Sequence, residues 1–248
     1  QIWNAGEYES HGRFISDLGA PLIDLLKPRP GESVLDLACG DGALTERLAA
    51  SGARVVGVDN APDFVAAATA RGIDARLMDA HALDLPERFD GIFTNAALHW
   101  MHDPDAVVAG VHRHARTGAR FVGEFGGFGN VAAIVTAVIA VLDRRGIDGA
   151  ARHPWYNPTT EEFAALLAKH GFDAEDIALI PRPTPLPTGI AQWIRMFCGL
   201  FFSGLDDDAR ADAVREVEDL LRPSLCDRNG TWYADYVRLR FRAVAVAA

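Results

Sequence analysis

Residues 34–60 read VLDLACGDGALTERLAASGARVVGVDN, and this pattern predicts one parallel β-α-β unit. An apolar run at 34–38 precedes a glycine-bearing turn, a helical segment follows at 43–50, and a second apolar run covers 54–58. Ligands of open parallel sheets bind beyond the carboxyl ends of such strands. The stretch is therefore typical of a site for a nucleoside-containing ligand.

The turn of this unit carries residues suited to such a ligand. Gly40 and Gly42 have no Cβ, so the backbone can turn tightly and approach a ligand closely. Asp59 follows about twenty residues later, where a carboxylate can accept hydrogen bonds from both hydroxyls of a ribose.

The charge of the turn distinguishes between cofactors. A dinucleotide site has a G-x-G-x-x-G turn that faces a pyrophosphate, whereas this turn contains Asp41 and lacks the third glycine. No lysine or arginine occurs between Ser33 and Glu46. Because like charges repel in a partly dehydrated turn, the sequence disfavours a diphosphate and favours a cationic or zwitterionic nucleoside.

Three stretches resemble a known family. LDLACGDG, residues 35–42, resembles motif I of the class I S-adenosylmethionine (SAM) methyltransferases, and VVGVDNAPDFVAAA, residues 55–68, resembles their second motif. The resemblance continues through MDAHALDLPERFDGIFTNAALHWMHDPDAV, residues 78–107, and covers the chain to about residue 130. Within the class the chain is similar to the small-molecule group that includes trans-aconitate methyltransferases. Ala38 stands where the family usually has glycine, so we expect a slightly altered loop and a retained site.

The alternation of apolar and helical segments predicts the fold class. We expect a Rossmann-like, doubly wound α/β sheet of seven strands, mostly parallel, with an antiparallel final strand and a helical insertion before that strand. The expected strands are 33–38, 54–58, 74–78, 89–95, 119–124, 174–182 and 231–246, and the expected helices include 43–50, 62–70, 104–115 and 131–145. A capping pattern, Thr159 to Glu162, predicts the start of a further helix.

We expect a single methyltransferase domain over residues 1–248. It consists of an N-terminal helical lid (1–30), a SAM-binding core (31–130) and a C-terminal half (131–248) with its helical insertion at about 187–228. The aromatic residues of the N-terminal segment are explained equally well by the packing of an amphipathic helix. An aromatic-rich segment in the insertion, WIRMFCGLFF, fits either a helix packed in the core or the wall of an apolar substrate pocket.

The composition of the chain limits the classes of molecule that it is expected to bind. A net charge of −10 and a pI near 5.2 disfavour nucleic acid, which is bound by clustered lysine and arginine. The chain has three cysteines without C-x-x-C spacing, so neither a disulfide framework nor a metal site is expected. No apolar run reaches the length of about 18 residues that a bilayer requires. We therefore expect a cytoplasmic protein without a membrane partner, and the oligomeric state stays open.

The resemblance implies which residues bind SAM. Asp59 is expected to hold the ribose, Asp79 the exocyclic amine of adenine, and the Asn95 region, together with motif I, the methionine part. Asp36 is expected to reach the methionine ammonium through water. The full expected set is Tyr8, Asp36, Ala38, Gly40, Asp59, Asn60, Asp79, Ala80, Asn95 and Ala96. Any single aspartate of this set has the alternative role of a helix cap or turn residue.

Two residues are candidates for a catalytic base. His99 is a candidate because a histidine side chain ordinarily titrates near neutral pH. Its alternative role is to orient its loop or to flank Trp100. Glu124 lies beside two glycines. Three roles are open for it: a base, a ligand of the substrate or a support of the loop. A carboxylate acceptor would need no base, because it is already anionic, whereas a hydroxyl or amine acceptor would need one.

These observations predict a SAM-dependent methyltransferase of class EC 2.1.1 that converts SAM to S-adenosylhomocysteine. The expected acceptor is a small molecule, methylated at a carboxylate or hydroxyl oxygen. Two alternatives remain open. One is a non-catalytic module that binds SAM, and the other is an NAD-type oxidoreductase, which shares the β-α-β unit.

Overall fold

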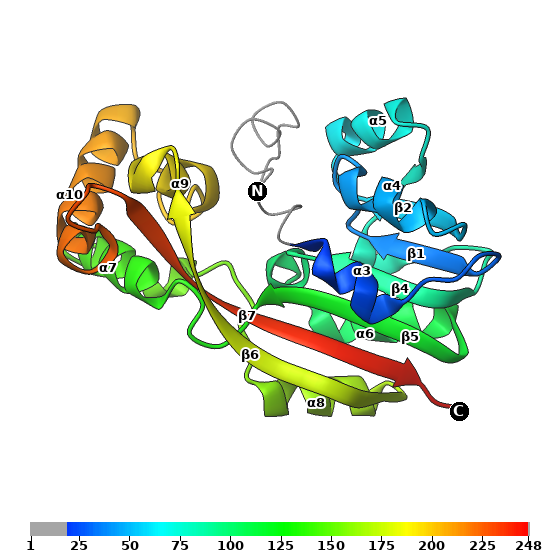
Figure 1. The fold of residues 1–248 in the computed structure, drawn as a ribbon. Coiled ribbons are helices and arrows are strands. Elements are labelled where there is room, and N and C mark those ends of the chain that lie inside the picture. Colours follow the sequence, from blue (N-terminus) through cyan, green and yellow to red (C-terminus); the bar gives the residue numbers. More distant parts are fainter. Residues whose placement is uncertain (1–18, 248) are drawn as a thin grey trace. The chain divides into compact units, whose positions relative to one another are not determined.

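The computed structural model describes residues 19–247, which contain a seven-stranded sheet in the order β3-β2-β1-β4-β5-β7-β6 (Figure 1). The strands are β1 (Ser33–Leu37), β2 (Arg54–Asp59), β3 (Asp74–Leu77), β4 (Phe89–Asn95), β5 (Ala115–Gly126), β6 (Phe172–Leu186) and β7 (Trp232–Ala245). Strands β1 to β5 pair in parallel, and β7 is antiparallel to both β5 and β6. The predicted doubly wound, mostly parallel sheet with an antiparallel final strand is confirmed.

Helices alternate with these strands. They are α3 (Pro21–Leu26), α4 (Ala43–Ala49), α5 (Pro62–Ala70), α6 (Pro104–His114), α7 (Ala132–Asp143), α8 (Thr160–Lys169), α9 (Gly189–Phe197) and α10 (Asp207–Leu225). Short 3-10 helices are η1 (Ala80–Ala82), η2 (Leu98–Trp100) and η3 (Ala150–Arg152). Among the described residues, no helix combines the length and the apolar character needed to cross a membrane.

The chain divides into two compact units. We call the described residues 19–127, 156–179 and 239–247 the sheet unit, and residues 128–155 and 180–238 the helical unit. Strands β6 and β7 contribute residues to both units. The expectation of a single domain, with its lid and core boundaries, stays a prediction.

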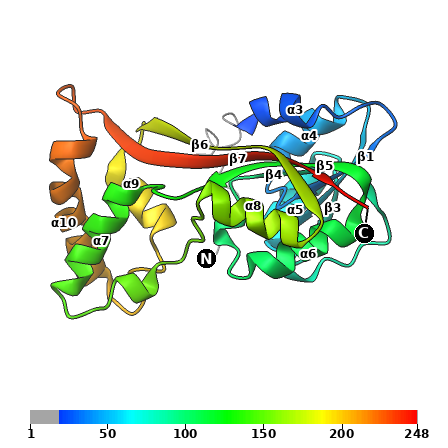
Figure 2. The same ribbon diagram turned by 90° about the horizontal axis from the view of Figure 1, so that it is seen from below.

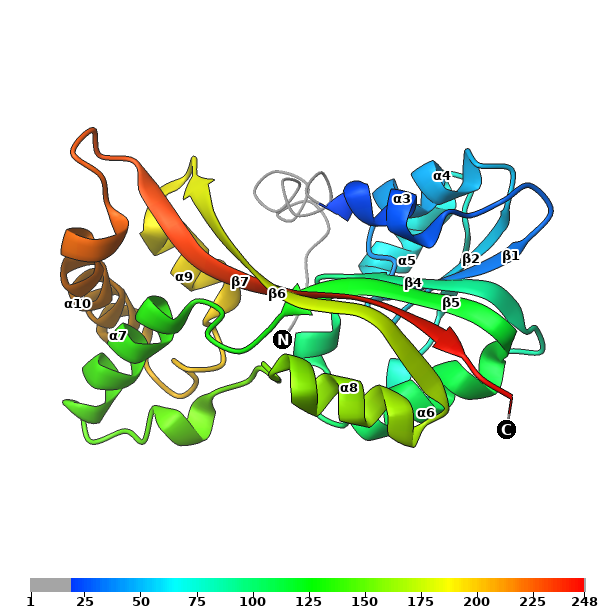
Figure 3. The ribbon, with the colours of Figure 1, turned by 60° about the horizontal axis from the view of Figure 1, so that its bottom comes forward.

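Helices cover both faces of the sheet unit (Figures 2 and 3). On one face α3 and α4 pack through a cluster of buried residues that includes Leu22, Leu48 and Phe93. On the opposite face α6 and α8 contribute to a larger cluster that includes Val111 and Phe163. These two layers bury both faces of the parallel strands, which explains why those strands read as nearly continuous apolar runs.

The predicted start of α8 is confirmed in detail. The Thr159 hydroxyl accepts a hydrogen bond from the Glu162 backbone N–H at 3.2 Å, and the Glu162 carboxylate accepts one from the Thr159 N–H at 2.9 Å. This reciprocal pair satisfies two N–H groups that have no partner within the helix.

The helical unit has an aromatic core of its own. Trp193, Phe197 and Phe201 are at most 6% exposed, and the Trp193 indole N–H donates to the Tyr236 hydroxyl at 2.6 Å. The rings of Trp155 and Trp193 lie 6.4 Å apart. The aromatic-rich segment of the insertion therefore packs as core, one of the two roles that the sequence allowed.

The face of β7 that is buried changes along the strand. Even-numbered side chains from Trp232 to Arg238 are buried, and then odd-numbered side chains from Leu239 to Ala245 are buried. Strict alternation along residues 231–246 would place Tyr233, Val237, Leu239 and Phe241 on one buried face. That grouping is wrong for the first half of the strand, where Tyr233 and Val237 are only half-buried.

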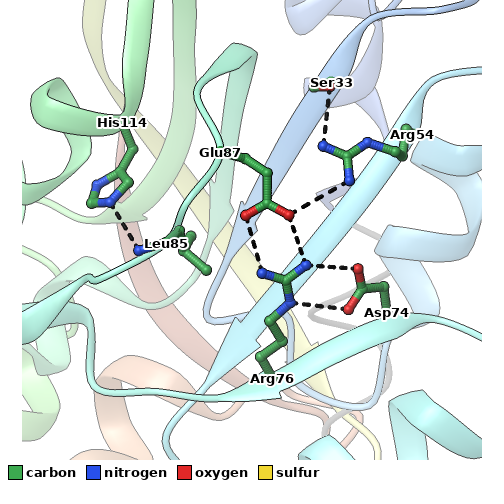
Figure 4. A network of polar contacts seen from close by, with 7 residues as sticks. All are labelled: Ser33, Arg54, Asp74, Arg76, Leu85, Glu87 and His114. Carbon is green, nitrogen blue, oxygen red and sulfur yellow. Dashed lines mark hydrogen bonds and ion pairs between the residues drawn. The ribbon is translucent and has the colours of Figure 1, made fainter.

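A polar network protects the edge strand of the sheet unit (Figure 4). The Arg76 guanidinium on β3 lies 2.9 Å from the carboxylates of both Asp74 and Glu87. Arg54 pairs with the same Glu87 at 3.6 Å and donates to the Ser33 hydroxyl. Charged side chains of this kind keep an exposed strand edge from pairing with another chain.

Candidate active site

The sheet order defines where a ligand is expected. The chain runs outward from β1 to β3 and then returns, so that β4 pairs with β1 on the other side. Open α/β sheets bind ligands beyond the carboxyl ends of the strands at this reversal. The structure places nine predicted residues in or just beyond the carboxyl ends of β1 to β4, namely Asp36, Ala38, Gly40, Asp59, Asn60, Asp79, Ala80, Asn95 and Ala96. Tyr8, the tenth, lies outside the described residues.

The turn after β1 adopts a left-handed backbone at several positions. Ala38, Gly40 and Gly42 have φ values of 59°, 56° and 82°. A Cβ built on Gly40 would meet no atom of residues 19–247 within 4 Å, whereas one on Gly42 would lie 3.0 Å from the Ala68 Cβ on α5. Gly40 therefore faces open space, and Gly42 lets α5 pack closely against the turn.

Asp59 ties the end of β2 to this turn. Its Oδ2 accepts a hydrogen bond from the Gly40 N–H at 2.9 Å, and its Oδ1 accepts one from the Ala61 N–H at 2.9 Å. Burial raises the pKa of the Asp59 carboxyl. Each carboxylate oxygen has a second lone pair, so the group can accept further hydrogen bonds from a ligand.

Asp36 is a buried acid in β1, two residues before Ala38 at the start of the turn. It is 2% exposed, and the Thr45 hydroxyl donates to its Oδ2 at 2.6 Å. Burial raises the pKa of Asp36 to about 7, the Thr45 hydrogen bond lowers it, and the negative charge of Asp59 raises it further. A cation bound beside Asp36 would offset the free-energy cost of ionising this buried carboxyl and would favour its ionised form.

The structure corrects the charge argument for the turn. Asp41 is paired with Arg71, whose guanidinium lies 3.1 Å from its Oδ2, and Asp41 Oδ1 accepts from the Ala43 N–H at 3.2 Å. The inference that the turn carries an uncompensated negative charge is therefore wrong. Arg71 follows α5, thirty residues along the chain, so a local reading of the sequence could not include it.

The ends of β3 and β4 carry the next polar groups. Asp79 caps η1, and its Oδ1 accepts from the His81 N–H and the His81 ring. The Asn95 side chain lies against Gly19, where an added Cβ would come within 2.6 Å of Asn95 Nδ2. Ala96 has φ of 54°, and its N–H donates to the Glu124 carbonyl at 2.7 Å, which joins the ends of β4 and β5.

His99 is held in place by its neighbours. It is 7% exposed, and its Nδ1 accepts a hydrogen bond from the Gly126 N–H at 3.3 Å. Its carbonyl accepts from the Tyr156 N–H at 2.9 Å. In the neutral ring the hydrogen therefore sits on Nε2, and the Nδ1 lone pair is already used. This geometry favours the orienting role that the sequence left open for His99.

Glu124 is engaged in an ion pair. It is 2% exposed, and its Oε2 accepts from Arg240 Nε at 2.9 Å and lies 2.7 Å from Arg240 Nη2. The Arg240 guanidinium occupies Oε2 and holds the buried carboxylate against β7. The structure therefore favours support of the β5 end over proton transfer. Arg240 comes from β7, and the sequence offered no signal for this pairing beyond the charge of its side chain.

The donor and acceptor groups of this edge fit SAM. The open space over Gly40 is where the backbone can approach the cofactor, and the carboxylates of Asp36, Asp59 and Asp79 suit a ligand with hydroxyls, an amine and positive charge. The sheet unit contains all three carboxylates.

Comparison with known proteins agrees with this geometry. The methyltransferase domain family matches residues 35–123. An uncharacterized methyltransferase of Schizosaccharomyces pombe is 35% identical over 257 residues, covering 97% of this chain and 97% of that protein. A trans-aconitate 2-methyltransferase of Deinococcus radiodurans is 32% identical over 119 residues, covering 47% of this chain and 46% of that protein. The solved structure of a methyltransferase candidate from Bacillus halodurans has a TM-score of 0.66 at 17% identity, covering 92% of this chain and 98% of that chain.

The chain belongs to the methyltransferase family. Its reaction is methyl transfer (EC 2.1.1), and its cofactor is SAM, which leaves as S-adenosylhomocysteine.

Proposed function

We propose that the enzyme methylates a carboxylate oxygen of a small-molecule acceptor. The state of the two candidate bases is the observation that carries this proposal. His99 accepts the Gly126 N–H at Nδ1, and Glu124 is paired with Arg240. A hydroxyl or amine acceptor needs a group that removes a proton, whereas a carboxylate is anionic at neutral pH and needs none.

Relatives support an acid as acceptor. The matching protein from Deinococcus radiodurans is a trans-aconitate 2-methyltransferase. A small molecule is also favoured over nucleic acid by the net charge of −10, because phosphate backbones are bound by clustered positive charge.

Five of the predicted residues have a proposed part in holding the cofactor. Asp59 accepts from the ribose hydroxyls, Asp79 accepts from the adenine amine, and Asp36 balances the methionine ammonium through water. Asn95 and the turn around Gly40 contact the methionine part. Bound SAM supplies an electrophilic methyl group on a sulfonium sulfur. Holding two reactants in line contributes about 7 to 11 kcal/mol to such a reaction.

Turnover with a panel of acceptors tests the proposal. Formation of S-adenosylhomocysteine is measured with carboxylic acids, phenols and amines of similar size, from pH 6 to pH 9. We expect the acids to react with a rate that is flat across this range, since they are ionised throughout. Turnover that is confined to phenols or amines and rises with pH would contradict a carboxylate acceptor.

A matched variant separates the role of His99. His99→Asn keeps a hydrogen-bond acceptor for the Gly126 N–H but cannot take up a proton near neutral pH. With an acid as acceptor, this variant should retain kcat within about tenfold, because only the orientation of the loop is perturbed. A loss of several orders of magnitude would indicate that His99 is a base.

A further inference from the structure

A group of polar side chains surrounds Asp79 just beyond β3. The His81 ring Nδ1 lies 2.7 Å from Asp79 Oδ1, and the His81 backbone N–H donates to the same oxygen at 3.0 Å. The second ring nitrogen, Nε2, accepts from the Asp103 N–H at 3.4 Å. The His81 ring is also stacked on that of His102, with centroids 6.0 Å apart and planes 11° from parallel.

The hydrogen bonds of the two ring nitrogens determine the tautomer of neutral His81. Since Nε2 accepts a hydrogen bond from a backbone N–H, the hydrogen of the neutral ring sits on Nδ1 and is donated to Asp79. Both nitrogens and one face of the ring are thus engaged. The loop that follows η2 supplies two of these contacts, through His102 and Asp103.

The two oxygens of Asp79 are consequently different. Oδ1 receives both hydrogen bonds from His81, while Oδ2 has no partner among residues 19–247. The Asp79 side chain is 57% exposed, so Oδ2 is open to a ligand. The hydrogen bonds from the His81 backbone and ring lower the pKa of Asp79, which keeps the group ionised and able only to accept.

We propose that His81 is a positioning residue that orients Asp79 so that Oδ2 alone meets the purine, and that it thereby makes the enzyme selective for a 6-amino over a 6-oxo purine in its cofactor. This inference rests on the proposed contact between Asp79 and the adenine amine. A 6-amino group donates to Oδ2, whereas a 6-oxo group would place a second acceptor against it. A fixed carboxylate rejects the oxo compound, while a freely rotating carboxylate turns away from it.

The contacts of His81 explain why orientation requires a specific side chain. An exposed aspartate ordinarily samples several rotamers, and binding has to select one of them at an entropic cost. Two hydrogen bonds to one oxygen restrict that choice before the ligand arrives. A cap made by the His81 backbone N–H alone would persist in any variant, so the ring contact is the part that substitution removes.

Binding of two cofactor products tests the inference by calorimetry. S-adenosylhomocysteine and S-inosylhomocysteine differ in the purine, where the inosyl compound has an oxo group in place of the 6-amine and a hydrogen on N1. The native protein should prefer the adenosyl compound by roughly ten- to a hundredfold, as expected for one hydrogen bond to a charged group. His81→Leu should reduce this preference to about threefold or less, mainly by weakening the adenosyl compound.

A conservative variant tests whether another hydrogen-bond donor can replace the His81 ring and keep the preference for the adenosyl compound. His81→Asn places an amide N–H near the position of Nδ1, so it should keep most of the preference. In an Asp79→Ala background the preference should already be lost, and adding His81→Leu should change the ratio by less than about twofold. The matched control is His170→Leu, which removes another histidine–aspartate pair, His170 Nε2 to Asp105 Oδ1 at 3.0 Å, that makes no contact with Asp79.

The outcomes separate the inference from the proposed function. If His81→Leu is folded by circular dichroism and keeps the full preference, His81 does not position Asp79, and the methyltransferase proposal is unaffected. A native protein that binds both compounds equally would overturn the role of Asp79 as well. Absence of any binding of S-adenosylhomocysteine to the native protein would overturn the cofactor site itself.

Discussion

The protonation of Asp36, which is proposed to face the methionine ammonium, is coupled to the stability of the fold. Its side chain is almost fully buried, and desolvation is the main cause of its raised pKa. In the unfolded chain the pKa of an aspartate is about 3.9, so between that value and about 7 the folded state binds more protons than the unfolded state. Stability contributed by this group is therefore present at low pH and is lost as the pH rises towards 7.

The Asp36→Asn variant should remove this pH dependence. The difference in unfolding free energy between native protein and variant should fall with a slope of at most about 1.4 kcal/mol per pH unit between pH 5 and 7, and then become flat. Urea unfolding at pH 5, 6, 7 and 8 measures this difference, in which the other titrating groups cancel. Parallel profiles of the two proteins would show that Asp36 is ionised in the folded state throughout.

Ala38 is strained by its backbone conformation. Its φ of 59° is favourable for glycine and costs an alanine about 1 kcal/mol. Ala38→Gly should therefore raise the unfolding free energy by up to about 1 kcal/mol, less the greater entropy of glycine in the unfolded chain. The matched control is Ala50→Gly at φ −61°, which should destabilise the protein. A loss of stability in both variants would contradict the strain at Ala38.

Asp59 joins the turn to β2 and is the proposed ribose ligand. Asp59→Ala should weaken SAM binding by about 2 kcal/mol, because the hydroxyls lose a charged acceptor. Titration calorimetry measures the affinity. Asp63→Ala, in the first turn of α5, is a control that removes an acidic side chain outside the proposed set. Equal affinity in the native protein and Asp59→Ala would remove this residue from the site.

At the scale of single elements, helix α7 begins without a side-chain cap from its own segment. Val131, its N-cap residue, has φ of 48° and makes no side-chain cap hydrogen bond. Asp235 from β7 takes over this role. Its Oδ2 accepts from the Ala133 N–H at 2.8 Å, and its carbonyl accepts from the Val131 N–H at 3.0 Å. A negative charge at a helix N-terminus is favourable in addition.

Asp235→Ala should lower the unfolding free energy by about 1 to 2 kcal/mol, the usual effect of removing a helix cap. Asp235→Asn keeps an acceptor and should recover a large part of that loss. Urea unfolding of the three proteins measures the ranking. The cap interpretation fails if the alanine and asparagine variants are equally stable.

At the scale of the whole molecule, β6 and β7 run through both compact units. Each of the two strands is one continuous element that belongs partly to each unit. We therefore expect the chain to unfold in one cooperative transition, although it has two hydrophobic cores.

SAM provides a test of this cooperativity. A ligand at one hundred times its dissociation constant stabilises the folded state by about 2.7 kcal/mol. The residues proposed to bind SAM lie in the sheet unit, as does Trp100, whereas Trp155, Trp193 and Trp232 belong to the helical unit. In a variant that carries Trp3→Phe and Trp100→Phe and so retains only these three tryptophans, the thermal midpoint should rise equally by tryptophan fluorescence and by far-UV circular dichroism. A fluorescence midpoint that stays constant while the other rises would show that the units unfold independently.

The sequence alone determined the core of the sheet and the positions of the candidate ligands. Apolar runs of strand length and helical periodicity are local properties, so β1, β2, β4 and α5 were predicted to within one residue. Gly40 and Asp59 were found because their roles depend on backbone freedom and on spacing along one β-α-β unit.

Only the tertiary structure decided which charges compensate one another and which face of a strand is buried. Arg71 neutralises Asp41, Arg240 pairs with Glu124, and the buried face of β7 changes at Leu239. These outcomes depend on groups brought together from distant parts of the chain. Electrostatic energy and burial are set by distance in space, which a periodic pattern along the sequence does not contain.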